Sequence, residues 1–184
     1  MRGSTIAALL ATVLATSGCL STTPAGDTAP VTIDAKAALS SVNAFRASNG
    51  LGPLTIAAGL TDAAAAQSAA MAGRQTMSHT VGGRLDARLA TAGYRWGVTA
   101  ENIGRDYRDY AGAIKGWENS PAHRRNMLNP TVTEIGMAGA RNVESGRAFW
   151  TMILAAPSRR TTVASVAPAF SFGHPIRVAA PPAP

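Results

Sequence analysis

The spacing of apolar residues predicts five helices along the chain. In the first helix, Leu39, Val42 and Phe45 lie on one face, because they recur every three or four residues. Asp34 is a suitable N-cap for this helix, and Asn49-Gly50 is a suitable end. The predicted helices cover residues 35–48, 60–74 and 84–92, a segment that Asp109 opens, and a short segment from Pro121 to Leu128.

Two apolar runs near the end of this pattern predict a β-hairpin. They cover residues 133–140 and 148–154, and the polar turn Asn142–Gly146 separates them. Pro53–Thr55 is predicted to be a short extended link, and Tyr94–Gly104 has no sustained period and is predicted to be irregular. The 184 residues therefore suit one domain of ordinary size with extensions.

The first nineteen residues have the order of an export signal. Arg2 is followed by an apolar run from Ile6 to Ala15, and small residues then lead to Cys19. The run is shorter than the roughly 20 apolar residues that span a bilayer. Ser17-Gly18-Cys19 resembles the bacterial lipobox, whose cysteine is lipidated, although Thr16 stands where leucine is usual.

These features predict the organisation of the chain. Residues 1–19 are a signal peptide, either lipidated at Cys19 or cleaved nearby with Cys19 incidental. Residues 20–33 form a flexible tether, 34–156 a folded domain, and 157–184 a mostly disordered tail rich in Pro, Ala and Arg. Because Cys19 is the only cysteine, no disulfide can form within the chain.

The net charge of +7 is divided between the body of the chain and its two ends. Between Leu20 and Ala156 the chain has 13 basic and 10 acidic residues, while three arginines lie in the tail without an acid nearby. This mild positive balance favours contact with anionic surfaces such as lipid head groups or acidic polymers. Without a basic helix or interleaved aromatic residues, the sequence does not predict a nucleic-acid partner.

His79, His123 and Glu101 are the candidates for chemistry. If His123 is the third residue of a helix that begins after Ser120, the positive end of the helix dipole favours a neutral imidazole near pH 7. Two neutral histidines and one carboxylate could bind Zn²⁺ or another divalent metal and leave an open position. Without a metal, the same groups could act as a general base and an orienting acid.

Structural roles for these residues stay open, because their spacing has no metal signature such as HExxH. His79 could end a helix, His123 could bond a loop carbonyl, and Glu101 could accept hydrogen bonds from backbone amides. The sequence also has no GxSxG elbow, no GxxxxGK[ST] phosphate loop and no cysteine nucleophile in the domain.

Six short motifs occur in the order seen in one protein family. They are NAFR (43–46), SHT (78–80), AGY (92–94), AENI (100–103), WENSPAHRRNML (117–128) and IGMA (135–138). From about Asp34 to Ala156 the chain resembles bacterial CAP-domain proteins, the SCP-like superfamily of cysteine-rich secretory proteins, antigen 5 and pathogenesis-related protein 1. The resemblance implies an α+β fold, a three-layer α-β-α sandwich with a central antiparallel sheet.

The resemblance also implies a cleft that gathers His79, Glu101 and His123. Eukaryotic members have a second cleft glutamate three residues after the tryptophan, where this chain has Ser120. Glu118 follows the tryptophan directly, about 100° away around a helix, and is expected to point away from the cleft. It is kept only as a doubtful candidate.

The expected function is that of an exported, lipid-anchored binding module of the cell envelope. It is expected to be a monomer in the outer membrane or periplasm, or to be secreted, and to bind a divalent metal with a small, lipidic or polymeric ligand. The alternative is a metal-assisted hydrolase or peptidase with Glu101 as base, and a third possibility is a structural protein with an inert cleft. Binding is favoured, because Ser120 leaves no second acid.

Overall fold

The computed structural model describes residues 25–158, and this range holds five helices and five strands. In chain order they are β1 (Thr28–Pro30), α1 (Ala35–Ala47), β2 (Thr55–Ile56), α2 (Ala58–Arg74), α3 (Leu85–Thr91), β3 (Trp96–Arg105), α4 (Tyr110–Asn119), α5 (Pro121–Met127), β4 (Glu134–Asn142) and β5 (Ala148–Pro157).

The first three helices begin and end within two residues of their predicted bounds. Asp34 caps α1 as expected, since its Oδ1 accepts a hydrogen bond of 2.9 Å from the amide of Ala37. Among the described residues, no helix is long and apolar enough to cross a membrane.

The strands form one central sheet in the order β1-β4-β5-β3. Each neighbouring pair in this order is antiparallel, and the two-residue strand β2 adds a short parallel pairing to β4. β4 and β5 are the predicted hairpin. β3 lies at one edge of the sheet, with Glu101 opposite Ile153 and Asn102 opposite Met152.

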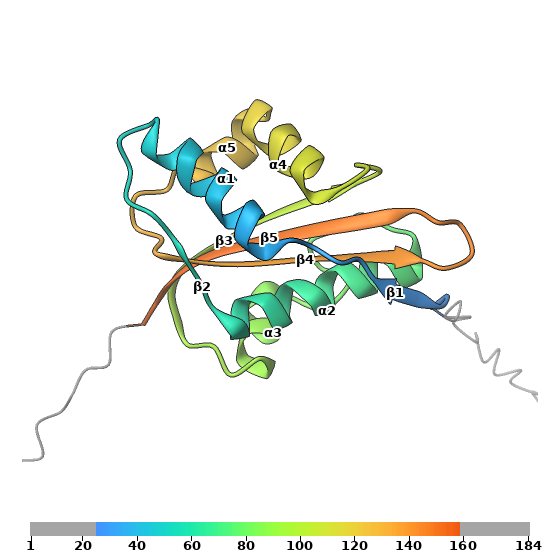
Figure 1. Ribbon diagram of the computed structural model, residues 1–184. Coiled ribbons are helices and arrows are strands. Elements are labelled where there is room, and N and C mark those ends of the chain that lie inside the picture. Colours follow the sequence, from blue (N-terminus) through green and yellow to red (C-terminus); the bar gives the residue numbers. More distant parts are fainter. Residues whose placement is uncertain (1–24, 159–184) are drawn as a thin grey trace, which may run out of the picture.

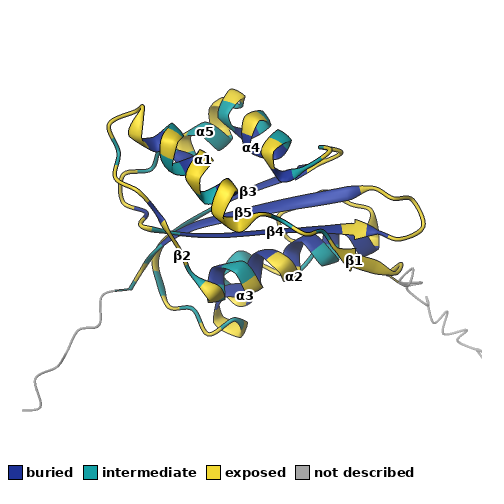
Figure 2. Cartoon of the chain, viewed as in Figure 1, coloured by how far each residue is buried: buried dark blue, intermediate teal, exposed yellow. Residues whose placement is uncertain are grey.

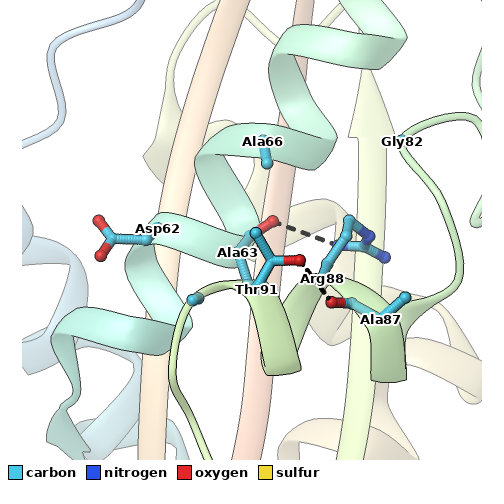
Figure 3. Close-up of a pocket in the computed structure, with 8 residues that line it drawn as sticks. Asp62, Ala63, Ala66, Gly82, Ala87, Arg88 and Thr91 are labelled. Atoms are coloured by element: carbon cyan, nitrogen blue, oxygen red, sulfur yellow. Dashed lines mark hydrogen bonds between the residues drawn. The ribbon is translucent and has the colours of Figure 1, made fainter.

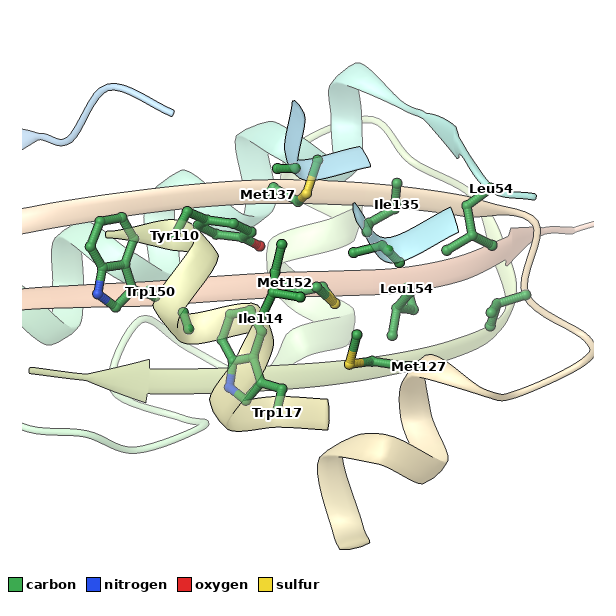
Figure 4. Packing of buried hydrophobic residues seen from close by; sticks show 14 of the residues in the cluster. Leu54, Tyr110, Ile114, Trp117, Met127, Ile135, Met137, Trp150, Met152 and Leu154 are labelled. Atoms are coloured by element: carbon green, nitrogen blue, oxygen red, sulfur yellow. The ribbon is translucent and has the colours of Figure 1, made fainter. Parts of the chain in front are cut away.

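Helices cover both faces of this sheet and confirm the three-layer sandwich. Figure 1 shows α1, α4 and α5 on one face and α2 and α3 on the other. Along β5, Trp150, Met152 and Leu154 pack against the first group of helices (Figure 4), whereas Phe149 and Ile153 face the second. Nearly all of β5 is therefore buried, because helices cover both of its sides (Figure 2).

The alanine-rich helix α2 lies unusually close to the sheet. A Cβ added at Gly136 of β4 would come within 2.1 Å of the Leu60 carbonyl carbon, so only glycine fits beneath this part of the helix. The small side chains Ala63 and Ala64 are likewise completely enclosed. This close approach places the loop after α2, and with it His79, beside β3.

Two predictions about local structure are wrong. Thr28–Pro30, which the sequence places in the flexible tether, forms strand β1, because it pairs with β4 across Thr28 and Asn142. Most of Tyr94–Gly104, which the sequence predicts to be irregular, belongs to β3 (Trp96–Arg105). The predicted signal peptide, Cys19 and residues 159–184 of the tail lie outside the described residues.

Candidate functional site

Glu101 is the centre of the candidate site. Its side chain is only 4% exposed, and its two oxygens have different partners. Oε1 lies 2.8 Å from Nδ1 of His79, and Oε2 lies 2.6 Å from Nη2 of Arg88. A carboxylate accepts hydrogen bonds, so His79 donates through Nδ1, and Nε2 is the ring nitrogen left for another partner.

Arg88 is the buried counter-ion of Glu101, and the sequence analysis did not single it out. Its side chain, on α3, is 4% exposed. Besides the carboxylate, the guanidinium contacts the carbonyl oxygens of Ala63, Gly83 and His79 at 3.2 to 3.4 Å. Figure 3 shows the bond to Ala63, beside a cavity of about 390 Å³ between α2 and α3. Arg88 therefore lines this cavity and also pairs with Glu101.

His79 lies in the loop after α2, with its side chain 57% exposed. Gln67 of α2 holds this loop at two points, since its Nε2 donates to the Ser78 carbonyl at 2.6 Å and its Oε1 accepts from the Gly82 amide at 3.2 Å. His79, with Nδ1 bound to Glu101, lines an open cavity of about 470 Å³. The residues lining this cavity are His79, Thr80, Arg84, Leu85, Asp86, Thr99, Ala100 and Glu101.

His123 is the third residue of α5, as predicted, and is half-buried. Burial lowers the pKa of His123 below its ordinary value of 6.5, and the nearby His79 lowers it further. The expected neutral form is thus supported, but burial is the main cause rather than the helix N-terminus. His123 is not among the residues that line the cavity beside His79.

Asn102 and Asn126 connect β3, which carries Glu101, to α5, which carries His123. Asn102 follows Glu101 on β3, and its Nδ2 donates to the His123 carbonyl at 3.2 Å. Asn126 of α5 donates in the opposite direction, to the Asn102 Oδ1 at 2.8 Å and to the Glu101 carbonyl at 3.3 Å. These three bonds fix the helix that carries His123 against the strand that carries Glu101.

The C-terminal end of α5 is held from the other side by Arg46 of α1. This guanidinium is 2% exposed and donates to the carbonyl oxygens of Gly52, Met127, Asn129 and Val132 at 2.8 to 3.5 Å. Burial lowers its pKa from the usual value of 12.5. Arg46 therefore ties α1, the end of α5 and the loop before β4 into one unit.

The donors in the site do not fit the expected three-ligand zinc centre. Within residues 25–158, no group of three or more His, Cys, Asp or Glu side chains is arranged to hold a metal ion. Glu101 already bonds His79 through one oxygen and the Arg88 cation through the other, so its negative charge is compensated by a guanidinium. Glu118, the doubtful candidate, forms an ion pair of 3.0 Å with Lys115 instead.

The arrangement can still hold a ligand or move a proton. A carboxylate bonded to one imidazole nitrogen orients the ring and sets which nitrogen is left for a ligand or a proton. The described hydrogen bonds give the His79 ring Glu101 as its partner and no serine, threonine or cysteine nucleophile. Any proton that Nε2 accepts would therefore come from water or from a bound ligand.

Comparison with known proteins places the chain in a family. Residues 39–154 match the cysteine-rich secretory protein (CAP) family. The chain is similar to the uncharacterized protein YkwD of Bacillus subtilis, with 36% identity over 112 residues, which are 59% of this chain and 42% of YkwD. It thus spans less than half the length of this relative.

Two solved structures support the fold. An extracellular protein of Bacillus anthracis that contains an SCP domain superposes with a TM-score of 0.58 and 26% identity, over 65% of this chain and 39% of that one. An outer surface protein of Borrelia burgdorferi superposes with a TM-score of 0.64 over 72% of this chain and 99% of its own, at 19% identity. With residues 39–154 matched and the sandwich in common, the chain belongs to the cysteine-rich secretory protein (CAP) family.

Proposed function

We propose that this chain is an exported CAP-domain protein of the bacterial cell envelope, and that its cleft beside His79 binds an envelope ligand without a resident metal. The observation that carries the proposal is the Glu101–His79 pair. A buried carboxylate orients an exposed imidazole towards an open cavity of about 470 Å³, within the usual range of small-ligand sites. The paired charges around Glu101 argue against a metal.

Export is supported by the relatives and by the N-terminal sequence. One structural neighbour is an extracellular protein and another is an outer surface protein. The apolar run ending at Cys19 has the order of a secretory signal. We therefore extend the proposal to lipidation of Cys19, which would hold the domain at a membrane.

Binding is tested by cosedimentation of the purified full chain with bacterial cell-wall sacculi. We expect the wild-type chain to pellet with the sacculi and the His79→Ala/His123→Ala variant to remain largely in solution. A matched variant, Asn142→Leu, changes a buried residue of the β4–β5 turn and should pellet like the wild type. Equal pelleting of wild type and double variant would refute a role for this cleft.

Lipidation is tested separately, in a bacterium that expresses the full chain. A palmitate analogue should label the wild type and leave Cys19→Ser unlabelled, with Cys19→Ser released from the membrane fraction. A labelled Cys19→Ser variant, or an unlabelled wild type, would refute the anchor and leave the cleft proposal intact.

One observation favours hydrolysis as a second candidate function. A buried carboxylate bonded to a histidine is the base-and-orienter half of many hydrolytic sites. Here His79 would take a proton from water while Glu101 holds its ring, and no protein nucleophile is required. Turnover of a cell-wall substrate that disappears in Glu101→Gln, while sedimentation with sacculi persists, would establish this alternative.

A further inference from the structure

The chemistry of the cavity beside His79 indicates which class of ligand it takes, provided that the cleft binds a ligand as proposed above. The first relevant feature is charge. Glu101 is paired with Arg88 at 2.6 Å, and Asp86 is paired with Arg84 at 3.1 Å. The two carboxylates that line the cavity are therefore each neutralised by a guanidinium.

This pairing disfavours ions of either sign. An anion such as a phosphate needs a cation that is not already committed, because attraction and repulsion otherwise nearly cancel over a few ångströms. A metal cation needs a carboxylate whose charge is not already compensated, and Glu101 is paired with Arg88. The cavity therefore offers little net electrostatic attraction to phosphate or to a divalent metal.

The remaining polar groups of the cavity include both hydrogen-bond donors and hydrogen-bond acceptors. His79 presents Nε2, and Thr80 and Thr99 contribute hydroxyls, which both donate and accept. Arg84 keeps Nη1 as a donor, since its Nε and Nη2 are the atoms that bond Asp86. Leu85 and Ala100 add an apolar surface between these groups.

Neutral hydroxyls and amides satisfy such a surface best, because each of these ligand groups can pair with the cavity without bringing an unpaired charge into it. The cavity is also open to solvent, so a ligand can continue beyond it as a chain. We propose that the cavity binds an uncharged, hydroxyl- and amide-bearing segment of an envelope glycan.

NMR titration of the full chain with three separate probes tests this proposal: chitohexaose, which is an uncharged hydroxyl- and acetamide-bearing oligosaccharide, inorganic phosphate, and zinc chloride. We expect chitohexaose to shift the signals of the cavity residues, and phosphate and zinc to leave them unchanged at equal concentration. The dissociation constant for chitohexaose should change less than about twofold between 50 and 500 mM NaCl, because no net charge is being screened.

Thr99→Val identifies the surface that is used, because it removes one half-buried hydroxyl and keeps the shape of the side chain. We expect it to weaken chitohexaose binding by about two- to tenfold, as for the loss of one hydrogen bond. Thr131→Val removes an exposed hydroxyl in the loop before β4 and should leave the affinity unchanged.

The outcomes separate this inference from the proposed function. Binding of phosphate or zinc in place of chitohexaose, or of none of the three probes, would overturn the glycan proposal. Phosphate binding, or binding of none of the probes, would not affect the proposed function if the sacculi still retain the wild-type chain and release His79→Ala/His123→Ala. Zinc binding would also contradict the proposal that the cleft has no resident metal. Chitohexaose binding that Thr99→Val leaves unchanged would place the sugar elsewhere and also overturn the inference.

Discussion

The buried pair between Arg88 and Glu101 permits a quantitative test of the site. Arg88→Met removes the cation from a carboxylate that is 4% exposed and leaves three carbonyl oxygens without their guanidinium donor. Removing one partner of a buried ion pair costs about 3–5 kcal/mol, because the other charge stays buried. We expect a loss of this size in the free energy of unfolding for Arg88→Met and for Glu101→Leu.

The double variant Arg88→Met/Glu101→Leu separates the pair from ordinary packing. With both charges gone, neither is left uncompensated, so the double variant should lose about 2–3 kcal/mol less than the sum of the two single variants. The assay is urea unfolding of the full chain at pH 7, analysed as a double-mutant cycle. Additivity within about 0.5 kcal/mol would refute the reasoning, since it would mean that the two side chains do not depend on each other.

Three further variants test the groups that hold and tune the site. Arg46→Met should lower the free energy of unfolding by about 3 kcal/mol in urea, since it strips a buried donor from several carbonyl oxygens, and a loss below about 1 kcal/mol would contradict this. His123→Gln should reduce the pH dependence of stability. Because the pKa of His123 is lower in the folded chain, the unfolded chain binds a proton at His123 first as the pH falls. The contribution of neutral His123 to the stability of the wild type is therefore complete above about pH 6.5 and is lost on acidification. Urea unfolding at pH 7.5 and 5.5 checks this, and an equal acid loss in both chains would count against it. Asn126→Leu should speed amide hydrogen exchange in α5, because it removes the bonds from α5 to β3. The control Asn142→Leu, at a buried asparagine of the β4–β5 turn, should leave exchange in α5 unchanged. Equal exchange in the two variants would show that Asn126 does not stabilise α5.

The helices could be predicted from the sequence because their apolar stripes are regular, whereas β3 could not. Glu101 and Asn102 are buried polar residues in the middle of β3, and Gly97 and Gly104 lie near its ends. This mixture hides the two-residue alternation that identifies a strand. β1 is only three residues long and exposed, so its pairing with β4 depends on the partner strand rather than on its own pattern.

The site was predicted in part. Twenty-two positions separate His79 from Glu101, and their contact depends on how α2 lies on the sheet rather than on local spacing. Arg88 was missed, but a signal for it exists, because it falls between Leu85 and Leu89 on the inward stripe of α3. Arg46 follows Leu39 and Val42 at the same helical spacing on α1. A cation inside an apolar stripe thus points to a buried partner, which the metal hypothesis for Glu101 did not consider.

The position of β3 at the edge of the sheet has a consequence for aggregation. An edge strand presents unpaired carbonyl groups to which a strand of another molecule can add. On β3, the carbonyl of Glu101 accepts from Asn126 of α5 at 3.3 Å, and that of Ile103 accepts from Trp117 Nε1 of α4 at 3.0 Å. Helices α4 and α5 thereby occupy two carbonyl groups of β3 to which a strand of another molecule could pair. A substitution that loosens either helix would also expose this edge to intermolecular β-pairing.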